Sequence, residues 1–513
     1  MSDFRTAKGR NPVWHQSSGA FSNFEFVDKR FQSNAIVRRI LSLARKCDYT
    51  SFLEETIEEN DCALLAEENH ALAARVKDFR GAKVTRLSFF RSAAPGNGGD
   101  FLGYAIIKED YFAAGSSAHV YEAVMTPPRG PKQNNFVHCA RRYEVTNSHG
   151  KFEVSGVLYA QQNDATFVCA HVALRTVLSS ILPKSDVSYH AINSILQVDH
   201  ADPNSQFGKV GGAQGRGVSP DQMEAVLRHY GLSPEKIVHE PNHGSPLPPD
   251  TEFQRLLYGY IESTSPALLG FELSKDPKTN AENRHIIPIF GHTFNEDLWA
   301  PEAERSYFGK NRGYFPSENW LSSYLAHDDN FGPYVCLPRH YLSGDEFRLL
   351  ISWHIPPVVL PSELAEALAV DFIVHFSKHH VVDHAEWYGR MKAFAIAGLL
   401  VLRSVLLSRA EYVDHLKALR DREGRLLEQA IIDKLTPKLP EHVWMVEASA
   451  PELFPASRRK FGEIVFDALQ APKAPTHNFL LFRAPGTVVF SDTGGIQSEA
   501  SALIGHTPLY NHA

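Results

Sequence analysis

The residues best suited to chemistry lie around Cys169, in the segment QQNDATFVCAHVALRTVL that spans residues 161–178. After Cys169, apolar residues follow the spacing of a helix with one buried face, and Thr166 is a suitable N-cap. This predicts that Cys169 lies in the first helical turn, where free N–H groups and the helix dipole favour an anion. Because the thiolate is the nucleophilic form of cysteine, the position suits a nucleophile. The alternative is that Cys169 is a small apolar residue of a core helix.

Side-chain amides precede this predicted helix. Gln161, Gln162 and Asn163 lie on the incoming loop. An amide there can direct N–H groups at the place where an acyl oxygen becomes negative during nucleophilic attack. Gln162 and Asn163 are the two candidates for this oxyanion donor.

QQNDATFVCAHVAL resembles the nucleophile segment of papain-like cysteine peptidases, and it is most similar to the bacterial double-glycine leader peptidase type. In that family an oxyanion glutamine leads into a cysteine that opens a long helix. Further segments resemble the family in the same order, over about a third of the chain. They are GVSPDQMEAVLRHYGLSPEKI at 217–237, with a serine cap that starts a helix, SPALLGFEL at 265–273, RHIIPIFGH at 284–292 and YLAHDDNFGPY at 324–334.

The resemblance implies a catalytic role for three residues. Cys169 would be the nucleophile, His285 would transfer protons, and an acid near the end of the strand in 324–334 would orient the histidine. Asp328 is the preferred third residue, and Asp329, Asn295 and Asp297 are the alternatives. If residues 285–294 are extended at about 3.3 Å per residue, Asn295 lies about 30 Å from His285 unless the chain turns early.

Three features depart from the family pattern. The position six residues before the cysteine, where the family has glutamine, is Asn163. Pro288 removes a ladder N–H, which predicts that its strand lies at a sheet edge or at a bulge. An insertion at 292–322 separates His285 from Asp328 and is rich in aromatic residues. Its aromatics either pin it to the C-terminal region or let part of it cover the cleft as a lid.

Two other groups of residues are weaker candidates for a functional site. Four histidines lie at 375–384, but the two i,i+4 pairs face directions about 140° apart and form no HExxH motif. We expect them to lie on polar helix faces, without a metal. The glycine-rich stretch at 208–217 fits no nucleotide-binding pattern and is interpreted as a flexible loop.

The elements that position these residues follow from the periodicity of the chain. Helical spacing predicts helices within 30–77, over NAIVRRILSLARKC and SFLEETIEENDCALLAEENHALAARV. From about residue 82, short segments rich in β-branched and aromatic residues predict an antiparallel sheet, with a hairpin at 147–150. Helices are predicted to dominate 362–435, and strands return before a tail after Gly495 that we expect to be poorly ordered.

These patterns predict four regions. They are a helical lead over 1–80, an antiparallel β region over 81–154, a papain-like catalytic domain over 155–345, and a region over 346–513 that is helical and then β. The expected fold class is α+β, with a papain-like cysteine peptidase core flanked by a β-rich N-terminal region and an α/β C-terminal region. A chain of 513 residues is too long for one ordinary core, which agrees with several domains.

Composition narrows the class of protein. The apolar fraction of 43% and the charged fraction of 22% are typical of a globular protein. A formal net charge of −7, with scattered basic residues, argues against non-specific nucleic-acid binding. Five cysteines without a CxxC motif indicate a reducing compartment. The N-terminus has no apolar signal segment, and the longest apolar stretch, at 393–402, is too short for a membrane span and is interpreted as a buried helix.

We therefore expect a cytoplasmic cysteine-nucleophile hydrolase, most simply a peptidase that cleaves a peptide or protein amide bond. One alternative is an inactive papain-like fold that binds or scaffolds, and another is a transglutaminase-type acyltransferase on the same site. We expect no cofactor, no nucleic-acid partner and no membrane insertion. The partner would be a peptide or protein substrate, with a possible protein partner at the N- or C-terminal region.

Overall fold

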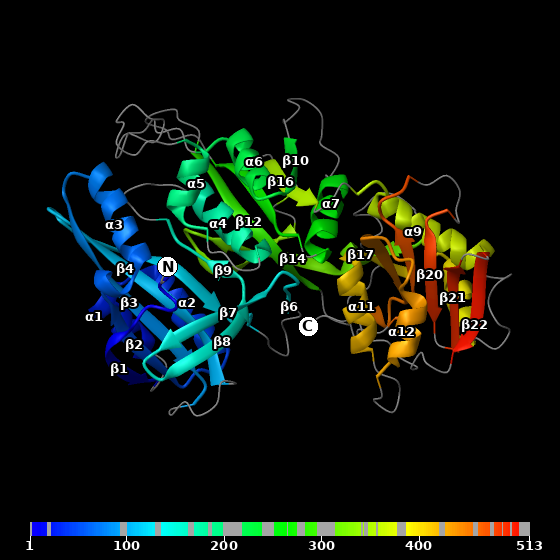
Figure 1. The fold of residues 1–513 in the computed structure, drawn as a ribbon, viewed down its shortest axis with the longest axis horizontal. Coiled ribbons are helices and arrows are strands. Elements are labelled where there is room, and N and C mark those ends of the chain that lie inside the picture. The colour runs from blue at the N-terminus through cyan, green and yellow to red at the C-terminus, as the bar shows by residue number, and fades with distance from the viewer. Residues whose placement is uncertain are drawn as a thin grey trace. The chain divides into compact units, whose positions relative to one another are not determined.

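The computed structural model forms two compact units, whose helices and strands Figure 1 colours along the chain. The first unit contains residues 1–243, 265–292 and 324–353, and the second contains 244–264, 293–323 and 354–513. The residues that the structure describes are 3–17, 22–92, 100–128, 135–162, 169–182, 187–197, 218–238, 251–263, 265–273, 283–294, 313–339, 342, 347–354, 358–376, 386–419, 426–454, 460–471, 477–484, 486–492 and 495–501. Both units mix helices and strands, as the sequence predicts.

The first unit begins with a six-stranded antiparallel sheet, in the order β1-β2-β3-β4-β5-β9. Its strands are β1 (Arg10–Gln16), β2 (Ser51–Ile57), β3 (Phe79–Phe90), β4 (Phe101–Phe112), β5 (Gly115–Met125) and β9 (Leu158–Tyr159). The helices nearby in the chain are α1 (Ser22–Phe31), α2 (Ala35–Lys46), the short 3₁₀ helix η1 (Glu59–Asp61) and α3 (Ala63–Arg75). Alternate side chains of the strands enter two separate cores, as a pleated sheet requires.

The predicted hairpin is confirmed. Strands β7 (Arg141–Asn147) and β8 (Gly150–Gly156) pair through a two-residue turn. Asn147 Oδ1 accepts the backbone N–H of His149 at 2.8 Å, which stabilises the turn. Gly150 has φ +141°, a conformation that residues with a Cβ rarely adopt. The hairpin packs its apolar side chains into the same core as one face of the first sheet.

The prediction of a continuous helical lead is wrong at two places. Residues 10–16 and 51–57 form strands β1 and β2, and these pair with each other. SFLEETI reads as helical because it continues into a helical stretch, yet its backbone pairs with β1 on one side and with β3 on the other. Sheet pairing therefore overrides local helix preference here. The helices predicted over 34–47 and in the second half of 51–76 are confirmed as α2 and α3.

A second sheet in the same unit carries the residues of interest. Its order is β10-β16-β11-β12-β14-β15, and the short strand β6 also pairs with β12. The strands are β6 (Asn135–Phe136), β10 (Ser233–Val238), β11 (Ala267–Leu273), β12 (Asn283–Phe294), β14 (Leu321–Asp328), β15 (Gly332–Pro338) and β16 (Phe347–His354). The helices that precede this sheet in the chain are α4 (Cys169–Ile181), α5 (Tyr189–Ile195) and α6 (Pro220–His229). The predicted serine cap is confirmed, because Ser219 forms a capping box at the start of α6.

Pro288 does not lie where the sequence predicts. Its strand β12 lies between β11 and β14, in the interior of the sheet. The pairing with β11 is continuous from Ala267–Ile289 to Leu273–Asn283, so it contains no bulge. The sheet therefore accommodates the missing N–H of proline in an interior strand, with no bulge in the pairing with β11.

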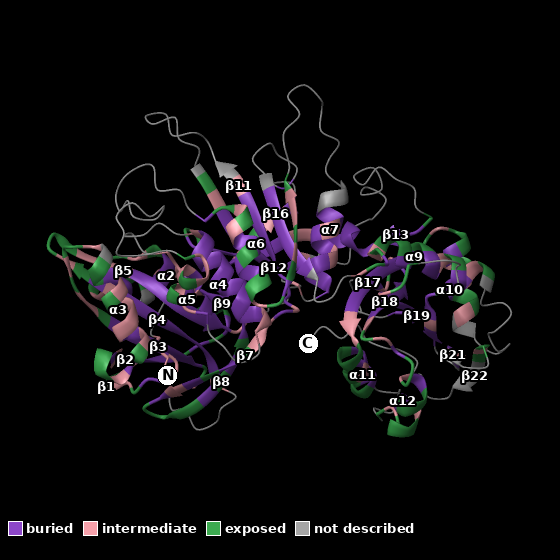
Figure 2. Ribbon diagram, turned by 45° about the horizontal axis from the view of Figure 1, so that its top comes forward, coloured by how far each residue is buried: buried purple, intermediate pink, exposed green. Residues whose placement is uncertain are grey.

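The second unit is built on one seven-stranded sheet, in the order β13-β17-β18-β19-β20-β21-β22. Its strands are β13 (Phe315–Pro316), β17 (Val401–Ser408), β18 (His442–Ser449), β19 (Gly462–Asp467), β20 (Phe479–Ala484), β21 (Gly486–Asp492) and β22 (Gly495–Ser501). Its helices are α7 (Thr251–Glu262), η3 (Ser317–Trp320), α9 (Ser362–Asp371), the π-helix η5 (Phe372–Phe376), α10 (Glu386–Ile396), α11 (Arg409–Ala418) and α12 (Gln429–Leu435). One core joins α9 and α10 to the sheet, and another joins α11 and α12 to it. Figure 2 shows the central strands as mostly buried.

Two predictions for this unit are wrong. The apolar stretch 393–402 is not one helix: α10 ends at Ile396, Gly398 adopts φ +68°, and β17 begins at Val401. Glycine accepts this left-handed conformation without strain, so the chain reverses there. The residues after Gly495 form strand β22 as far as Ser501, paired with β21. Residues 502–513 lie outside the described part.

A row of charged residues crosses this sheet on directly opposed positions. Arg403 pairs with Glu447, Glu447 with Glu463, and Glu463 with Arg483. The two adjacent glutamates would repel each other, but Lys460 Nζ lies 2.5 Å from Glu447 Oε1 and 2.6 Å from Glu463 Oε2. All five side chains are at least 96% buried, so the row is stable only as a complete set of pairs.

Part of the insertion at 292–322 belongs to the second unit. Tyr314, Phe315 and Trp320 are buried, and the Trp320 ring packs against Phe454 with centroids 5.2 Å apart. These three aromatics fix their segment to the core of the unit, as one of the two interpretations predicts. Residues 295–312, which include Trp299, lie outside the described part. Among the described helices, none has the length and apolarity needed to cross a membrane.

Candidate functional site

Cys169 is the first residue of helix α4 and is half-buried, while residues 170–180 are fully buried. The helix packs into a core with α5, α6 and the second sheet. Cys169 therefore lies in the first turn of the helix, where free backbone N–H groups favour a negative charge. The expected N-cap Thr166 lies outside the described residues.

A buried ion pair holds α4 to the first sheet. Arg175 Nη2 donates to Glu122 Oε2 at 2.5 Å, and Nη1 donates to the carbonyl of Tyr121 at 2.8 Å. The Arg175 guanidinium also lies 4.5 Å from the centre of the Tyr121 ring. Both charged side chains are almost inaccessible to water. This pair fixes the helix that presents Cys169, and nothing in the sequence spacing indicates that it forms.

His285 lies on β12, opposite Phe271 of β11. The Cys169 thiol forms a hydrogen bond with its ring. The structure therefore brings together two residues that are more than a hundred positions apart in the chain. The His285 side chain is 12% exposed, so the pair lies close to the surface without being freely solvated.

Two carboxylates approach the same nitrogen of His285. Its Nε2 lies 3.4 Å from Asp328 Oδ1 and 3.4 Å from Asp329 Oδ1. Asn330, which follows them, places Nδ2 3.4 Å from the same nitrogen. The structure thus places both predicted acids near the imidazole. It does not select one of them as the sole partner.

The turn after β14 explains this arrangement. Asp328 is the last residue of the strand, and its Oδ1 accepts the backbone N–H of Asn330 at 2.8 Å and of Phe331 at 3.2 Å. These bonds form the tight turn that leads into β15 and orient the carboxylate. The next residue, Asp329, is buried on the same turn, and its Oδ2 has no hydrogen-bond partner in the described part of the chain.

A second histidine supports the turn. His327 is buried, its Nε2 lies 3.2 Å from the carbonyl of Val157, and its Nδ1 accepts the backbone N–H of Tyr334 at 3.2 Å. Burial lowers the pKa of His327 to about 3, so the ring is neutral at physiological pH. A neutral ring with one donor and one acceptor satisfies both contacts. Sequence reasoning missed this role because both partners are distant or backbone groups.

The electrostatics of the site favour a cationic imidazole. Burial opposes ionisation of His285, but the hydrogen bonds with Asp328 and Cys169 and the charges of Asp329 and Asp328 outweigh it and raise the pKa of the ring to about 10. Burial also raises the pKa of Asp329 to about 6, although the charge of His285 opposes the change. The site therefore combines a protonated ring, a thiol and two acids within one cluster.

Other predicted residues are not placed in the cluster. Gln162 is half-buried and is the last described residue before the gap that precedes Cys169. Gln161 instead continues the first sheet, because its N–H donates to the carbonyl of Val120 at 2.8 Å and its side chain accepts from Val120. Asn163, Asn295 and Asp297 lie outside the described residues, as do the glycine-rich stretch at 208–217 and three of the four histidines at 375–384.

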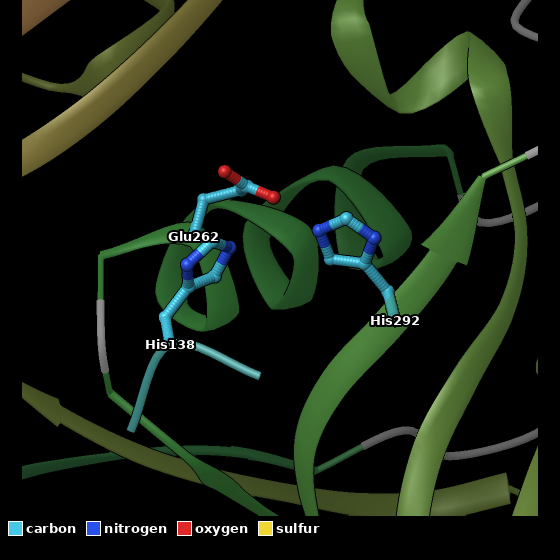
Figure 3. Close-up of side chains that lie close together, drawn as sticks. All are labelled: His138, Glu262 and His292. Carbon is cyan, nitrogen blue, oxygen red and sulfur yellow. The ribbon is translucent and has the colours of Figure 1, made fainter. Parts of the chain in front are cut away.

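A second pair of imidazoles lies in the first unit. Figure 3 shows His138, just after β6, and His292, on β12, with ring centroids 6.0 Å apart. Phe136 stacks on His292 at 5.2 Å. The figure also labels Glu262, which belongs to the second unit and there pairs with Arg403. Two imidazoles alone are fewer ligands than a protein metal site usually has.

The cluster around His285 contains the groups needed for nucleophilic catalysis, namely a nucleophile, a proton carrier and an acid that orients the carrier. Comparison with known proteins adds no family: no family model matches the chain, and no curated protein matches it well enough to count as a relative.

Proposed function

We propose that this chain is a cysteine-nucleophile hydrolase with a papain-like core that cleaves amide bonds in peptides or proteins. The observation that carries the proposal is the hydrogen bond between the Cys169 thiol at the start of α4 and His285, whose ring lies 3.4 Å from two carboxylates. The order of elements in this part of the first unit, a helix with the thiol followed later by strands with the imidazole and the acid, also supports it.

In the proposed reaction, Cys169 and His285 act as a thiolate–imidazolium pair. The sulfur attacks the carbonyl carbon of the amide, and the imidazolium gives its proton to the leaving nitrogen as the C–N bond breaks. The neutral ring then takes a proton from water as the water oxygen attacks the thioester carbon. The C–S bond breaks, the carboxylic acid is released, and the Cys169 thiolate and His285 imidazolium are restored. Asp328 and Asp329 stabilise the imidazolium before and after these steps.

Thiol reactivity tests the nucleophile directly. Among the five cysteines, Cys336 is exposed, Cys169 is half-buried, and the other three are buried. At pH 6–7 we expect iodoacetamide to alkylate Cys169 at least about tenfold faster than Cys336, although Cys336 is more accessible, because only a thiolate reacts quickly. Peptide mapping by mass spectrometry at several times gives both rates within one sample.

The matched variants are His285→Ala and Cys336→Ser. Loss of His285 should slow alkylation of Cys169, whereas Cys336→Ser should leave it unchanged. Hydrolysis of a mixed peptide pool should disappear in Cys169→Ala. Equal alkylation rates for Cys169 and Cys336 would show that Cys169 is an ordinary thiol and would remove the basis of the proposal.

A further inference from the structure

The turn that carries Asp328 and Asp329 is held from outside its own sheet, by helix α2. Arg39 of α2 donates from Nε to the carbonyl of Pro333 at 3.4 Å and from Nη2 to the carbonyl of Tyr334 at 3.0 Å. These carbonyls follow the two acids by a few residues, at the start of β15. Because the guanidinium is a rigid fork of donors, the two bonds fix the direction of this backbone as well as its position.

The stem of Arg39 supports the same segment by packing. A Cβ placed on Gly332 would lie 2.8 Å from Cγ of Arg39, so the backbone of the turn lies directly against the arginine side chain. Gly332 also has φ +103°, a conformation that residues with a Cβ rarely adopt. The turn therefore fits closely against Arg39 in addition to its hydrogen bonds.

The segment that Arg39 holds is strained. Tyr334 has φ +52°, a left-handed conformation that is unfavourable for a residue with a Cβ. Its backbone N–H donates to His327 Nδ1 at 3.2 Å, and its hydroxyl donates to the carbonyl of Met125 at 2.8 Å. Such strain persists only where several contacts fix the conformation together. Loss of one of these contacts should let the segment relax, and the acids at the other end of the turn would then move.

Helix α2 is itself firmly attached. Asn34 caps it, because its Oδ1 accepts the backbone N–H groups of Ile36 at 2.9 Å and Val37 at 3.0 Å. The Nδ2 of the same residue donates to the carbonyl of Ala118 on β5 at 2.7 Å. Ile36 and Val37 are buried in the same core as Tyr334. The helix therefore gives its arginine a fixed base.

We infer that Arg39 is a positioning residue of the cluster around His285, since it holds the start of β15 and so keeps Asp328 and Asp329 against the imidazole. Its part in catalysis rests on the proposed function, whereas its effect on the acids rests on the contacts alone. Without the two bonds the strained segment relaxes, the carboxylates move away from the ring, and the imidazolium is no longer stabilised. A helix more than a hundred residues before Cys169 thus forms part of the site.

Arg39→Met tests the inference in the full chain, because methionine keeps an unbranched side chain but has no donor. The titratable groups at the His285 ring are Cys169 and the two acids. If the acids withdraw, the pKa of His285 measured by NMR should fall from about 10 to below about 9. Arg39→Lys can serve one carbonyl and should give a smaller fall. The matched control is Arg38→Met on the same helix, whose guanidinium pairs with Asp28, and its value should stay near 10.

A second comparison separates positioning from a general loss of structure. In a chain that already carries Asp328→Asn and Asp329→Asn, Arg39→Met should not change the pKa of His285 further, because no acid is left to position. Circular dichroism shows whether each variant is folded, and Arg39→Lys decides the question if Arg39→Met does not fold. The inference is overturned if the pKa of His285 stays near 10 in the folded Arg39 variants, or if Arg39→Met lowers it equally with and without the acids.

This inference and the proposed function fail separately, because an imidazole titration needs no reactive thiol. If the pKa of His285 falls as expected but Cys169 is an ordinary thiol, Arg39 positions the acids and the hydrolase is wrong. If Cys169 reacts rapidly but the pKa does not change, the role of Arg39 is wrong and the hydrolase stands. In peptide hydrolysis, the alkaline limb of the pH profile should move to lower pH in Arg39→Met, since the leaving nitrogen takes its proton from the ring.

Discussion

At the scale of single residues, the site depends on how two carboxylates share one imidazole. Asp328 and Asp329 lie at the same distance from His285 Nε2, so each contributes to the charge on the ring. Burial raises the pKa of Asp329 to about 6, with the charge of Asp328 acting in the same direction and the charge of His285 opposing it. The charges of both carboxylates favour the cationic form of His285.

Replacing one acid should change the titration of His285. In Asp328→Asn the pKa of the ring should fall from about 10 toward its ordinary value of 6.5, because a hydrogen bond and a charge that favour the cation are lost. Asp329→Asn should also lower it. Asn330→Ala removes an uncharged neighbour and should leave the pKa near 10. The chemical shift of the ring measured by NMR against pH gives each value directly.

The same change predicts the pH dependence of stability. The folded pKa of His285 lies above its unfolded value, so its contribution is fully present below about pH 6.5 and is lost as pH rises toward 10. Asp328→Asn should therefore lower the free energy of unfolding at pH 6, and the difference from the parent protein should shrink by pH 10. A difference that stays constant across this range would mean that Asp328 stabilises only the turn.

The sequence predicted which residues form the cluster, but it did not predict all of the contacts between them. A cysteine at a helix start, a histidine on a strand and two acids before a turn follow from local patterns around 169, 285 and 328. The roles of Asn330 and His327 do not, because these depend on which side chains meet across strands that are distant in the chain. The oxyanion donor also cannot be chosen from spacing, since Gln162 and Asn163 are adjacent.

At the scale of elements, the position of the nucleophile depends on how α4 is attached. Periodicity predicts the helix, but its anchor is the buried pair of Arg175 and Glu122. The same local rules mistook β2 and β17 for helices, because Ser51–Ile57 leads into a helical segment and Val401–Ser408 follows one. Only pairing with neighbouring strands distinguishes them, and that pairing is not local.

Arg175→Met should destabilise the protein strongly. The substitution leaves the buried Glu122 with only the more distant Arg5, whose Nε lies 3.9 Å from Glu122 Oε1, and breaking a buried pair typically costs about 3–5 kcal/mol. Arg175→Met combined with Glu122→Gln should recover part of the loss, since no charge is then left unpaired. Urea unfolding at pH 7 measures each difference. The matched control is Arg228→Met, which removes an exposed arginine from Glu224 on α6; Glu224 keeps Lys236 Nζ at 3.4 Å, so the change should cost less than about 1 kcal/mol. Similar losses for the two arginine variants would contradict the anchoring role.

At the scale of the whole molecule, two units have separate hydrophobic cores although the chain passes between them repeatedly. Sequence patterns predicted consecutive regions, but residues 265–292 and 324–353 join the first unit, while the stretch between them joins the second. Strand order explains why this is hard to foresee: β16 lies between β10 and β11, so a late segment completes an earlier sheet. Only the complete set of strand pairs defines such a unit.

If each unit is stable by itself, a substitution that destabilises the second unit should leave the reactivity of Cys169 in the first unit unchanged. Glu463 lies at the centre of the charge row of the second unit. Burial would raise its pKa, but Arg483, Lys460 and His415 outweigh burial and hold the pKa well below its usual range. Since the folded pKa is depressed, the stability from Glu463 is present above the unfolded value of 4.5 and is lost as pH falls below it.

Glu463→Gln should therefore lower the midpoint temperature of one of two unfolding transitions measured by calorimetry at pH 7. An unpaired cluster costs about 3–5 kcal/mol, and for a unit of this size each kcal/mol lowers the transition by about 2–4 °C, so the shift should be on the order of 10 °C. The alkylation rate of Cys169 and the other transition should not change. Glu441→Gln, at an exposed position of the same unit, is the control and should shift neither. The contrary outcome is that the midpoint temperatures of both transitions fall together, or that alkylation of Cys169 becomes slower. The two units would then unfold as one, and the second unit would contribute to the stability of the candidate site.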